Sequence, residues 1–343
     1  METLARAVPL ITEHYRQNGR TLPWRENTSP YSVWISEIML QQTRIEAVIP
    51  YYHRFLSALP SVSDLANADE EDLLKLWQGL GYYSRARNLK KAAQVVVEQH
   101  GGMLPDDAAA LRKLPGIGEY TAGAIASIAY GKPEPAVDGN VLRVVMRLLG
   151  CEADILQSQT KKAVNEALKQ IYPQGKDAGY FTQGIMELGE TVCVPNGAPL
   201  CEICPLKSLC NAVATHRTEQ LPIRAGKKAR RIEPRTVLRL QCGDYLALNK
   251  RPNNGLLAKM WELPNELGHR TLAELQERYP NAERITPLPN AKHIFSHVEW
   301  HMVGWEILLT EPPRDFTMAS AEEIREHFAV PNAFRAYLPS EKR

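Results

Sequence analysis

The 343-residue sequence contains no apolar run long enough to cross a membrane. Its N-terminal segment, METLARAVPLITEHYRQNG, is amphipathic and lacks the apolar centre and the cleavage pattern of a signal peptide. Cysteine is scarce, with six residues in the chain. No internal repeat or low-complexity tract is present. We therefore expect a globular protein of a reducing compartment, with no membrane partner.

The formal net charge of the chain is only +2, which does not indicate any particular class of binding partner. Positive charge is nevertheless concentrated over residues 216–235, where seven lysines and arginines stand against two glutamates. Composition alone favours a solvated linker, and the alternative is a linker that contacts phosphates. The length of the chain favours two domains, one on each side of this basic linker.

Residues 1–190 show the apolar spacing of helices in one segment after another, and no segment there alternates convincingly as a strand does. Serine–proline and glycine pairs stand at several of the segment ends, as expected where helices begin and stop. We predict an all-helical domain over residues 1–215. Its predicted helices cover residues 29–43, 69–80, 84–100, 118–131, 139–150 and 158–172.

The pattern changes after the basic linker. Residues 236–250 read as two strands around Gly243-Asp244, which predicts a β-hairpin. Further strands are predicted over residues 261–264 and 293–310, and short helices over residues 271–279 and 320–328. We therefore predict a small α+β domain over residues 236–343.

Four of the six cysteines lie close together, at the spacing C-x7-C-x2-C-x5-C. Clustered thiols in a reducing compartment indicate a metal before disulfides, and four thiolates can enclose zinc or an iron–sulfur cluster. Structural zinc sites usually use two C-x2-C pairs, whereas this segment has one pair with long unequal arms. We therefore favour an iron–sulfur cluster. The predicted ligands are Cys193, Cys201, Cys204 and Cys210.

The segment LPGIGEYTAGA, residues 114–124, places Gly116 and Gly118 around one isoleucine before a helical run. Glycine lets the backbone approach a phosphate closely, and the N–H groups at the start of the next helix face it. Alone, such a segment is more often an ordinary turn. The phosphate-binding interpretation gains support from the order of the downstream features, since Asp138 and then the cysteine segment come after this turn in the chain.

Two carboxylates are candidates for acid–base chemistry. Glu37 shares a predicted helix face with apolar side chains, and a partly buried carboxyl keeps its proton and can act as a general acid. The alternative is an ordinary surface glutamate. Asp138 can be explained as the N-cap of the helix that starts near Asn140, a position that keeps it ionised. One protonated acid and one anion together suit glycosidic bond cleavage.

The cysteine spacing resembles the C-x6-C-x2-C-x5-C 4Fe–4S loop of the endonuclease III family of DNA-repair glycosylases, with a first spacer one residue longer. LPGIG resembles the helix-hairpin-helix turn of the same family. Over nearly its whole length the chain resembles the adenine DNA glycosylases of the MutY type. The segments that carry this resemblance are LPWR (22–25), SEIMLQQT (36–43), GLGYYSRARNL (79–89), LPGIGEYTA (114–122) and VDGN (137–140).

The resemblance implies a mainly α, helix-hairpin-helix glycosylase domain with one 4Fe–4S cluster, followed by a smaller α+β, Nudix-like domain that recognises 8-oxoguanine. It implies removal of adenine mispaired with 8-oxoguanine or guanine in double-stranded DNA. Glu37 would protonate the adenine, Asp138 with Asn140 would stabilise the sugar cation, and Tyr120 would line the pocket. Bifunctional relatives attack with a lysine where this chain has Tyr120, so a monofunctional enzyme is expected.

The residues that the resemblance implies for contact with DNA or with the extruded base are Leu22, Trp24, Arg25, Gln42, Thr43, Tyr82, Gly116, Gly118, Gln183, His293, Phe295, Ser296 and His297. Of these, Gln42 and Tyr82 would enter the stack that the adenine leaves. The alternative for Trp24 and Tyr82 is ordinary packing. For the segment 293–297 it is a strand with buried aromatic rings.

Two other functions remain open at this point. An endonuclease III-like pyrimidine glycosylase and lyase is opposed by Tyr120, and a non-catalytic binder of damaged DNA is opposed by Glu37 and Asp138. True Nudix hydrolases need a helix with the sequence REx2EExG. The segment ELGHRTLAELQERYP matches only half of this motif, and Pro280 breaks the helix. We therefore expect no pyrophosphatase activity. We expect a cytoplasmic monomer, associated with the nucleoid if the source is bacterial.

Overall fold

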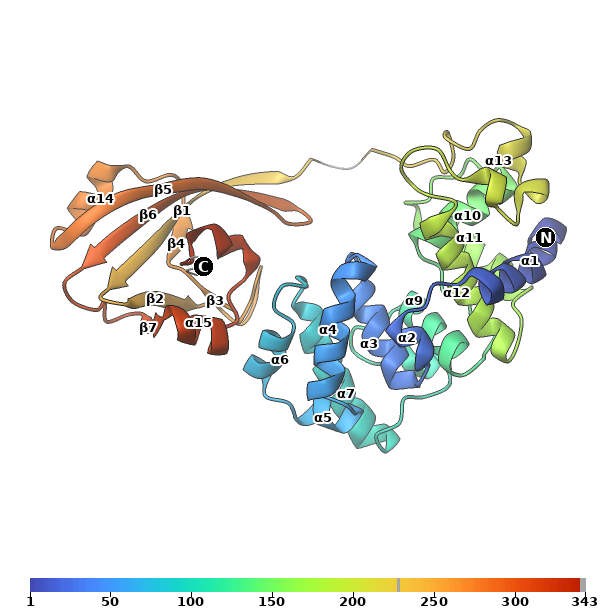
Figure 1. Cartoon of the computed structure of the whole chain (residues 1–343), viewed down its shortest axis with the longest axis horizontal. Coiled ribbons are helices and arrows are strands. Elements are labelled where there is room, and N and C mark those ends of the chain that lie inside the picture. The colour runs from blue at the N-terminus through green and yellow to red at the C-terminus, as the bar shows by residue number, and fades with distance from the viewer. Residues whose placement is uncertain (227–228, 340–343) are drawn as a thin grey trace. The chain divides into compact units, whose positions relative to one another are not determined.

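The computed structural model describes residues 1–226 and 229–339, so Lys227 and Lys228 of the predicted basic linker lie outside the described residues. The chain divides into two compact units, whose elements are labelled in Figure 1. The first comprises residues 1–67 and 88–226, and the second residues 68–87 and 227–343. Among the described residues, no helix combines the length and the apolar character that a membrane crossing requires.

The first unit is helical, as predicted. Its elements are α1 (Glu2–Asn18), α2 (Pro23–Glu26), α3 (Pro30–Leu40), α4 (Ile45–Ala58), α5 (Val62–Asn67), most of α7 (Ser84–His100), α8 (Ala108–Leu111), α9 (Glu119–Ala124), the π-helix η1 (Ile125–Ala129), α10 (Gly139–Leu149), α11 (Ser158–Lys169), α12 (Lys176–Thr191), the 3-10 turns η2 (Cys201–Ile203) and η3 (Lys207–Leu209), and α13 (Asn211–Ala214). The α-helices of this unit that were not predicted from the sequence are α1, α2, α4, α5, α8, α12 and α13.

Helix α10 lies at the centre of one core of this unit. It begins at its N-cap Asp138 and ends at Gly150, whose φ of 65° lies in the left-handed region that favours glycine. Its apolar side chains are buried together with those of α1 and α12. Two arginines of the same helix, Arg143 and Arg147, are also buried, at 2% and 4% exposure. Buried guanidinium groups need hydrogen-bond partners, and one partner of Arg143, Asn140, lies at the candidate site.

The predicted helix over residues 118–131 is α9 followed directly by the π-helix η1. Gly123 allows α9 to lie close against the segment that leads to Asp138, because a Cβ at this position would lie 2.0 Å from the carbonyl oxygen of Pro135. This close approach brings the start of α9 and the start of α10 to the same site.

The second unit contains α6 (Glu70–Leu76) and a seven-stranded mixed sheet with the order β3-β2-β1-β6-β5, in which β4 pairs with β1 and β7 with β2. Its bounds are β1 (Arg231–Cys242), β2 (Tyr245–Lys250), β3 (Trp261–Glu262), β4 (Asn265–Leu267), α14 (Leu272–Arg278), β5 (Ala282–Ile294), β6 (Val298–Leu309), β7 (Thr317–Ser320), α15 (Ala321–His327) and the 3-10 helix η4 (Asn332–Tyr337). Strands β1 and β6 are parallel, and the other pairs are antiparallel.

The predicted hairpin over residues 236–250 is confirmed, with Cys242 opposite Tyr245 in the β1–β2 pair. The predicted single strand over 293–310 is wrong in one respect. It consists of the end of β5 and the whole of β6, joined by a short turn at residues 295–297. This turn carries three of the side chains that were predicted to contact DNA. They therefore lie outside the strand pairing.

Candidate functional site

A cavity of about 540 Å³ lies in the first unit, between α2, α3, the start of α9, the start of α10 and one face of α12. Of the residues predicted from the sequence, those that line it are Leu22, Trp24, Arg25, Glu37, Gln42, Thr43, Tyr120, Asp138, Asn140 and Gln183. Segments more than 160 residues apart in the chain, from Leu22 to Gln183, therefore meet at one concave site.

Glu37 lies in the wall of this cavity and is only 6% exposed. Helix α3 holds it there because most of its residues are buried, so the helix has almost no solvent face. The hydroxyl of Tyr120 donates a hydrogen bond to Glu37 Oε2 at 2.6 Å. Burial raises the pKa of Glu37 to about 7, although the Tyr120 hydrogen bond opposes this rise. Glu37 can therefore hold its proton near neutral pH, as a general acid must.

Asp138 is the N-cap of α10. Its Oδ1 accepts the backbone N–H of Val141 at 2.8 Å, and its Oδ2 accepts Nδ2 of Asn140 at 2.8 Å. Burial raises the pKa of Asp138, and these hydrogen bonds oppose that rise. Because N–H donors at a helix start favour the anion, Asp138 is better suited than Glu37 to remain ionised.

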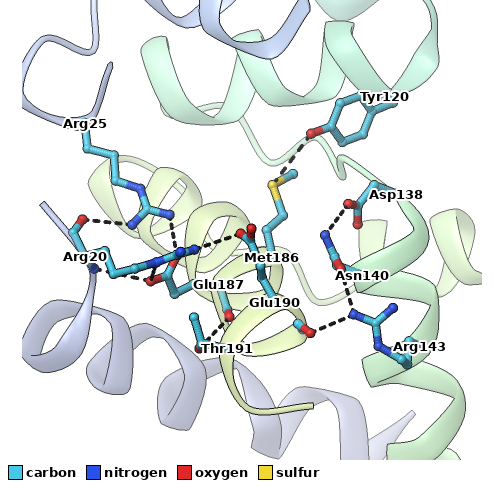
Figure 2. Close-up of polar contacts among 11 residues, drawn as sticks. Arg20, Arg25, Tyr120, Asp138, Asn140, Arg143, Met186, Glu187, Glu190 and Thr191 are labelled. Atoms are coloured by element: carbon cyan, nitrogen blue, oxygen red, sulfur yellow. Dashed lines mark hydrogen bonds and ion pairs between the residues drawn. The ribbon is translucent and has the colours of Figure 1, made fainter. Parts of the chain in front are cut away.

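Asn140 is itself held by a buried arginine. Arg143 Nη2 donates to Asn140 Oδ1 and to the carbonyl of Gly189, each at 2.7 Å, and Arg143 Nε donates to the carbonyl of Cys193 at 2.6 Å. Figure 2 shows the polar contacts that join Asp138, Asn140 and Arg143. An unbroken set of hydrogen bonds thus links the candidate anion to the first of the four clustered cysteines.

A second charged group lies on the α12 side of the cavity. Glu187, 6% exposed on its side chain, accepts hydrogen bonds from Arg20 Nε at 2.6 Å and from Arg25 Nη2 at 2.7 Å. Burial opposes the charge of Glu187, but the two arginines outweigh it and hold the pKa of this carboxyl below its usual value. Arg20 also pairs with Glu190 at 2.8 Å. Figure 2 shows both guanidinium groups directed at Glu187, so Arg25 is fixed at the cavity wall.

Sequence reasoning missed Glu187 and Arg20, and it also missed Met186, whose Sδ lies 3.8 Å from the Tyr120 hydroxyl. A signal for two of them was present, because Gln183, Met186 and Glu187 follow one another at helical spacing. That signal was not used because α12 itself was not predicted. Arg20 left no local signal, since its partner lies 167 residues away.

The glycine turn before α9 lies outside the cavity lining. Gly116 has a φ of 78°, in the left-handed region, and a Cβ at this position would lie 2.7 Å from the Cβ of Asn88 on α7. Gly118 is the N-cap of α9, with no atom within 4 Å of the place where a Cβ would lie. The first N–H groups of a helix have no partner within it, so this open turn can receive a phosphate oxygen.

The remaining predicted contact residues lie in the second unit, around a cavity of about 610 Å³. It is lined in part by Tyr82, His293, Phe295, Ser296 and His297. Tyr82 is 44% exposed, and its hydroxyl forms a 2.9 Å hydrogen bond with Ser296 Oγ. Burial lowers the pKa of His293, whose ring packs against Phe295 at 4.6 Å between centroids. This cavity brings together aromatic rings and short polar groups, which suits contact with bases.

The four clustered cysteines lie in the segment that follows α12. Within the described residues, no three Cys, His, Asp or Glu side chains already converge as metal ligands. The donor set nevertheless fits an iron–sulfur cluster, since Cys193, Cys204 and Cys210 pack on the core around α10 and Arg147 Nη1 lies 3.3 Å from Cys193 Sγ. Burial raises the pKa of Cys204 to about 11, and a bound metal would favour its thiolate form.

Comparison with known families agrees with this arrangement. Residues 35–174 match the family model of the HhH-GPD superfamily of base excision DNA repair proteins, and residues 236–340 match the NUDIX domain. The predicted fold class, a helix-hairpin-helix glycosylase domain with a Nudix-like domain after it, is therefore confirmed.

Relatives match over most of their length. The chain is 34% identical to the adenine DNA glycosylase of Rattus norvegicus, covering 94% of this chain and 76% of the relative. It is 35% identical to that of Homo sapiens (94% and 72%) and 34% identical to that of Buchnera aphidicola subsp. Baizongia pistaciae (87% and 84%).

Among solved structures, the chain is similar to a thermostable thymine-DNA glycosylase, with a TM-score of 0.56 and 29% identity over 62% of this chain and 98% of that one. It is also similar to endonuclease III in a non-covalent DNA complex, with a TM-score of 0.52 and 25% identity over 62% and 95%.

Proposed function

Because the chain belongs to the adenine DNA glycosylase family and is a DNA N-glycosylase of base excision repair, we propose that it removes adenine mispaired with 8-oxoguanine or guanine in double-stranded DNA. The observation that carries this proposal is the pairing of a buried acid, Glu37, with a capped carboxylate, Asp138, in one cavity. That pairing suits acid-assisted cleavage of the N-glycosidic bond of a base turned out of the helix.

Glu37 is the proton donor in this proposal. Adenine leaves poorly as an anion, so protonation at N7 must accompany cleavage of its bond to C1′. Tyr120 donates to Oε2 of Glu37, which leaves Oε1 as the oxygen that carries and delivers the proton. The electron pair of the breaking bond passes to the purine, and a positive charge develops on the sugar.

Asp138 opposes that charge. Its carboxylate is kept ionised by the N–H of Val141 and by Asn140, so its charge is already in place when the cation forms. Addition of water at C1′, with loss of one proton to a carboxylate, completes the hydrolysis. Asn140 in turn is oriented by Arg143.

The base itself is held on the other side of the cavity. Leu22 and Trp24 are apolar and line the cavity, so they offer apolar contact surface to a purine ring. Arg25, fixed by Glu187, and Gln183 supply hydrogen-bonding groups at the edge. A site of this kind favours a base that pairs with all of its hydrogen-bonding groups. A base that leaves some of these groups unpaired binds less well.

The enzyme is monofunctional in this proposal. An imine with the opened sugar requires an amine at the site, and no lysine is present in the described lining of this cavity. Tyr120, at the position of the lysine in bifunctional relatives, has its hydroxyl bonded to Glu37. Base removal should therefore leave an intact strand with an abasic site.

Gln42 and Tyr82 enter the DNA stack, and residues 293–297 contact the 8-oxoguanine. In support, Gln42 and Tyr82 are both non-glycine residues with positive φ, 60° and 47°, a strained conformation that is concentrated at functional positions. Gly116 and Gly118 bind a backbone phosphate in the same complex.

Cys193, Cys201, Cys204 and Cys210 would hold one 4Fe–4S cluster, which would stabilise the segment after α12. Metal analysis of the purified protein should find four iron atoms per chain. One zinc atom per chain instead would overturn this assignment without affecting the proposed reaction.

The decisive experiment is a single-turnover assay on duplexes with adenine opposite 8-oxoguanine or guanine, analysed with and without alkali. A duplex with an oxidised pyrimidine serves as the comparison. We expect cleavage at the adenine only after alkali, and more quickly opposite 8-oxoguanine. Cleavage at the pyrimidine without alkali would instead indicate a bifunctional pyrimidine glycosylase.

A further inference from the structure

The turn that carries Tyr82 is built around one buried arginine. Arg85 is 9% exposed, and its Nη2 donates to the carbonyls of Leu80 at 3.1 Å and Gly81 at 3.2 Å. The indole N–H of Trp77, which is fully buried, donates to the same Gly81 carbonyl at 3.1 Å. These bonds fix the carbonyl groups immediately before Tyr82, where the chain turns through two left-handed residues, Gly81 with φ 69° and Tyr82 with φ 47°.

The same guanidinium group contacts the Tyr82 side chain. Its central carbon lies over the Tyr82 ring at 5.5 Å from the centroid and over the Trp77 ring at 5.3 Å. Burial lowers the pKa of Arg85 to about 10, which leaves the group charged at neutral pH. A cation over an aromatic ring attracts it and restricts its rotation. Tyr82, whose hydroxyl is also hydrogen-bonded to Ser296 Oγ, therefore stays exposed in a defined orientation.

We propose that Arg85 is a positioning residue, which holds the backbone turn and the ring of Tyr82 in the orientation that the ring needs to enter the base stack of a mispair. This inference rests on the proposed function, because it assigns to Tyr82 the role of a stacking wedge. Arg85 itself contacts neither the base nor the sugar. By ordering Tyr82 beforehand, Arg85 reduces the conformational entropy that this side chain loses when it enters the DNA.

The test uses the full chain and a duplex with a tetrahydrofuran abasic analogue opposite 8-oxoguanine, with 2-aminopurine beside the lesion. Fluorescence of 2-aminopurine reports stacking by Tyr82, and no excision can occur. Single-turnover excision is measured in parallel on adenine opposite 8-oxoguanine. The variants are Arg85→Met, Arg85→Lys, Tyr82→Leu and the double variant of Tyr82→Leu with Arg85→Met.

We expect Arg85→Met to lose most of the fluorescence change and to slow excision about tenfold, the range of one desolvated cation–π contact. Arg85→Lys keeps the charge but cannot bridge two carbonyls, so it should lose about threefold. The double variant should be no slower than Tyr82→Leu alone, since both changes remove the same effect. Arg54→Met is the matched control. Its guanidinium lies over Tyr51 at 4.6 Å, and it lines neither cavity.

The outcomes separate this inference from the proposed function. If the unsubstituted protein does not excise adenine opposite 8-oxoguanine, the proposed function fails. If it does, and Arg85→Met gives the full fluorescence change, Arg85 does not position Tyr82. Additive losses in the double variant would overturn the inference equally. Should Arg85→Met not fold, as thermal melting would show, an unchanged fluorescence response in Arg85→Lys would count against the role of the bridging hydrogen bonds.

Discussion

The cavity of the first unit is lined by several carboxylates and one arginine, Arg25, on helices. The cavity of the second unit is lined instead by glycines, aromatic rings and histidines, several of them on turns. In the first, the carboxyl side chain of Glu37 is 6% exposed, and in the second Tyr82 is 44% exposed. A carboxyl group that is buried away from water has a raised pKa, so it can keep a proton at neutral pH and then donate it. Reading a base requires rings and polar groups that can reach DNA. In the proposed function, the first cavity therefore carries out the reaction on the adenine, and the second contacts the base opposite it.

The largest effect should come from Glu37→Gln, because it removes the proton donor and keeps the shape of the side chain. Excision should slow about 10³-fold, within the range of general acid catalysis. Single-turnover rates on adenine opposite 8-oxoguanine measure this. Affinity for the abasic-analogue duplex is the control and should not change, because this duplex holds no adenine for Glu37 to protonate. A normal excision rate would remove Glu37 from the acid role.

The pH dependence of excision should follow Glu37. Its protonated form is the active one and its pKa is about 7, so the single-turnover rate should be level below pH 7 and fall about tenfold per pH unit above it. Tyr120→Phe provides the matched variant. It removes a hydrogen bond that lowers the pKa of Glu37, so the midpoint should move to higher pH. A rate that does not change with pH across and above this pKa would contradict the assignment.

Arg143→Met should have a smaller but clear effect on the reaction. It leaves the carbonyls of Gly189 and Cys193 without this donor and releases Asn140, so excision should slow about tenfold. Iron content and excision should be measured on the same preparation. Slower excision with full iron content would show that Arg143 acts through Asn140. If excision stays normal, the hydrogen bonds from Asp138 to Cys193 have no role in the rate.

The smallest effect on rate should come from Ser296→Ala combined with His297→Ala. The chemistry of the first unit is untouched, so excision of adenine opposite guanine should change little. The preference for 8-oxoguanine over guanine should fall about fivefold, the value of one lost hydrogen bond. Competition between the two duplexes gives this ratio directly. An unchanged preference would place lesion recognition outside the turn at residues 295–297.

Much of the candidate site could be predicted because its chemistry depends on local patterns. Glu37 lies at helical spacing among apolar residues, and Asp138 stands where a helix must begin, so both burial and capping follow from a few neighbouring residues. Glu187 and Arg20 could not be found in this way. Their role depends on an ion pair between two residues that are 167 positions apart in the chain. Neither local sequence shows a pattern that predicts this pair.

Parts of the fold also could not be predicted from local sequence patterns. Strand β5 was not predicted because its sequence, AERITPLPNAKHI, contains two prolines, which cannot donate to a sheet ladder. The structure accommodates the second of them through a register shift between Leu288 and Ala291. Likewise, residues 68–87 read as part of the helical domain but group with the second unit, because the contacts that decide this come from residues beyond 226.

The burial of Glu37 has a consequence for the folded state as a whole. Its pKa rises from 4.5 to about 7 on folding, so the native protein binds this proton more tightly than the unfolded chain does. Between these two values the free energy of unfolding therefore decreases as the pH rises, by about 3 kcal/mol in total. Below the lower value this loss is absent, and above the higher one it is complete. The enzyme therefore keeps a reactive acid in its interior at the expense of its own stability at neutral pH and above.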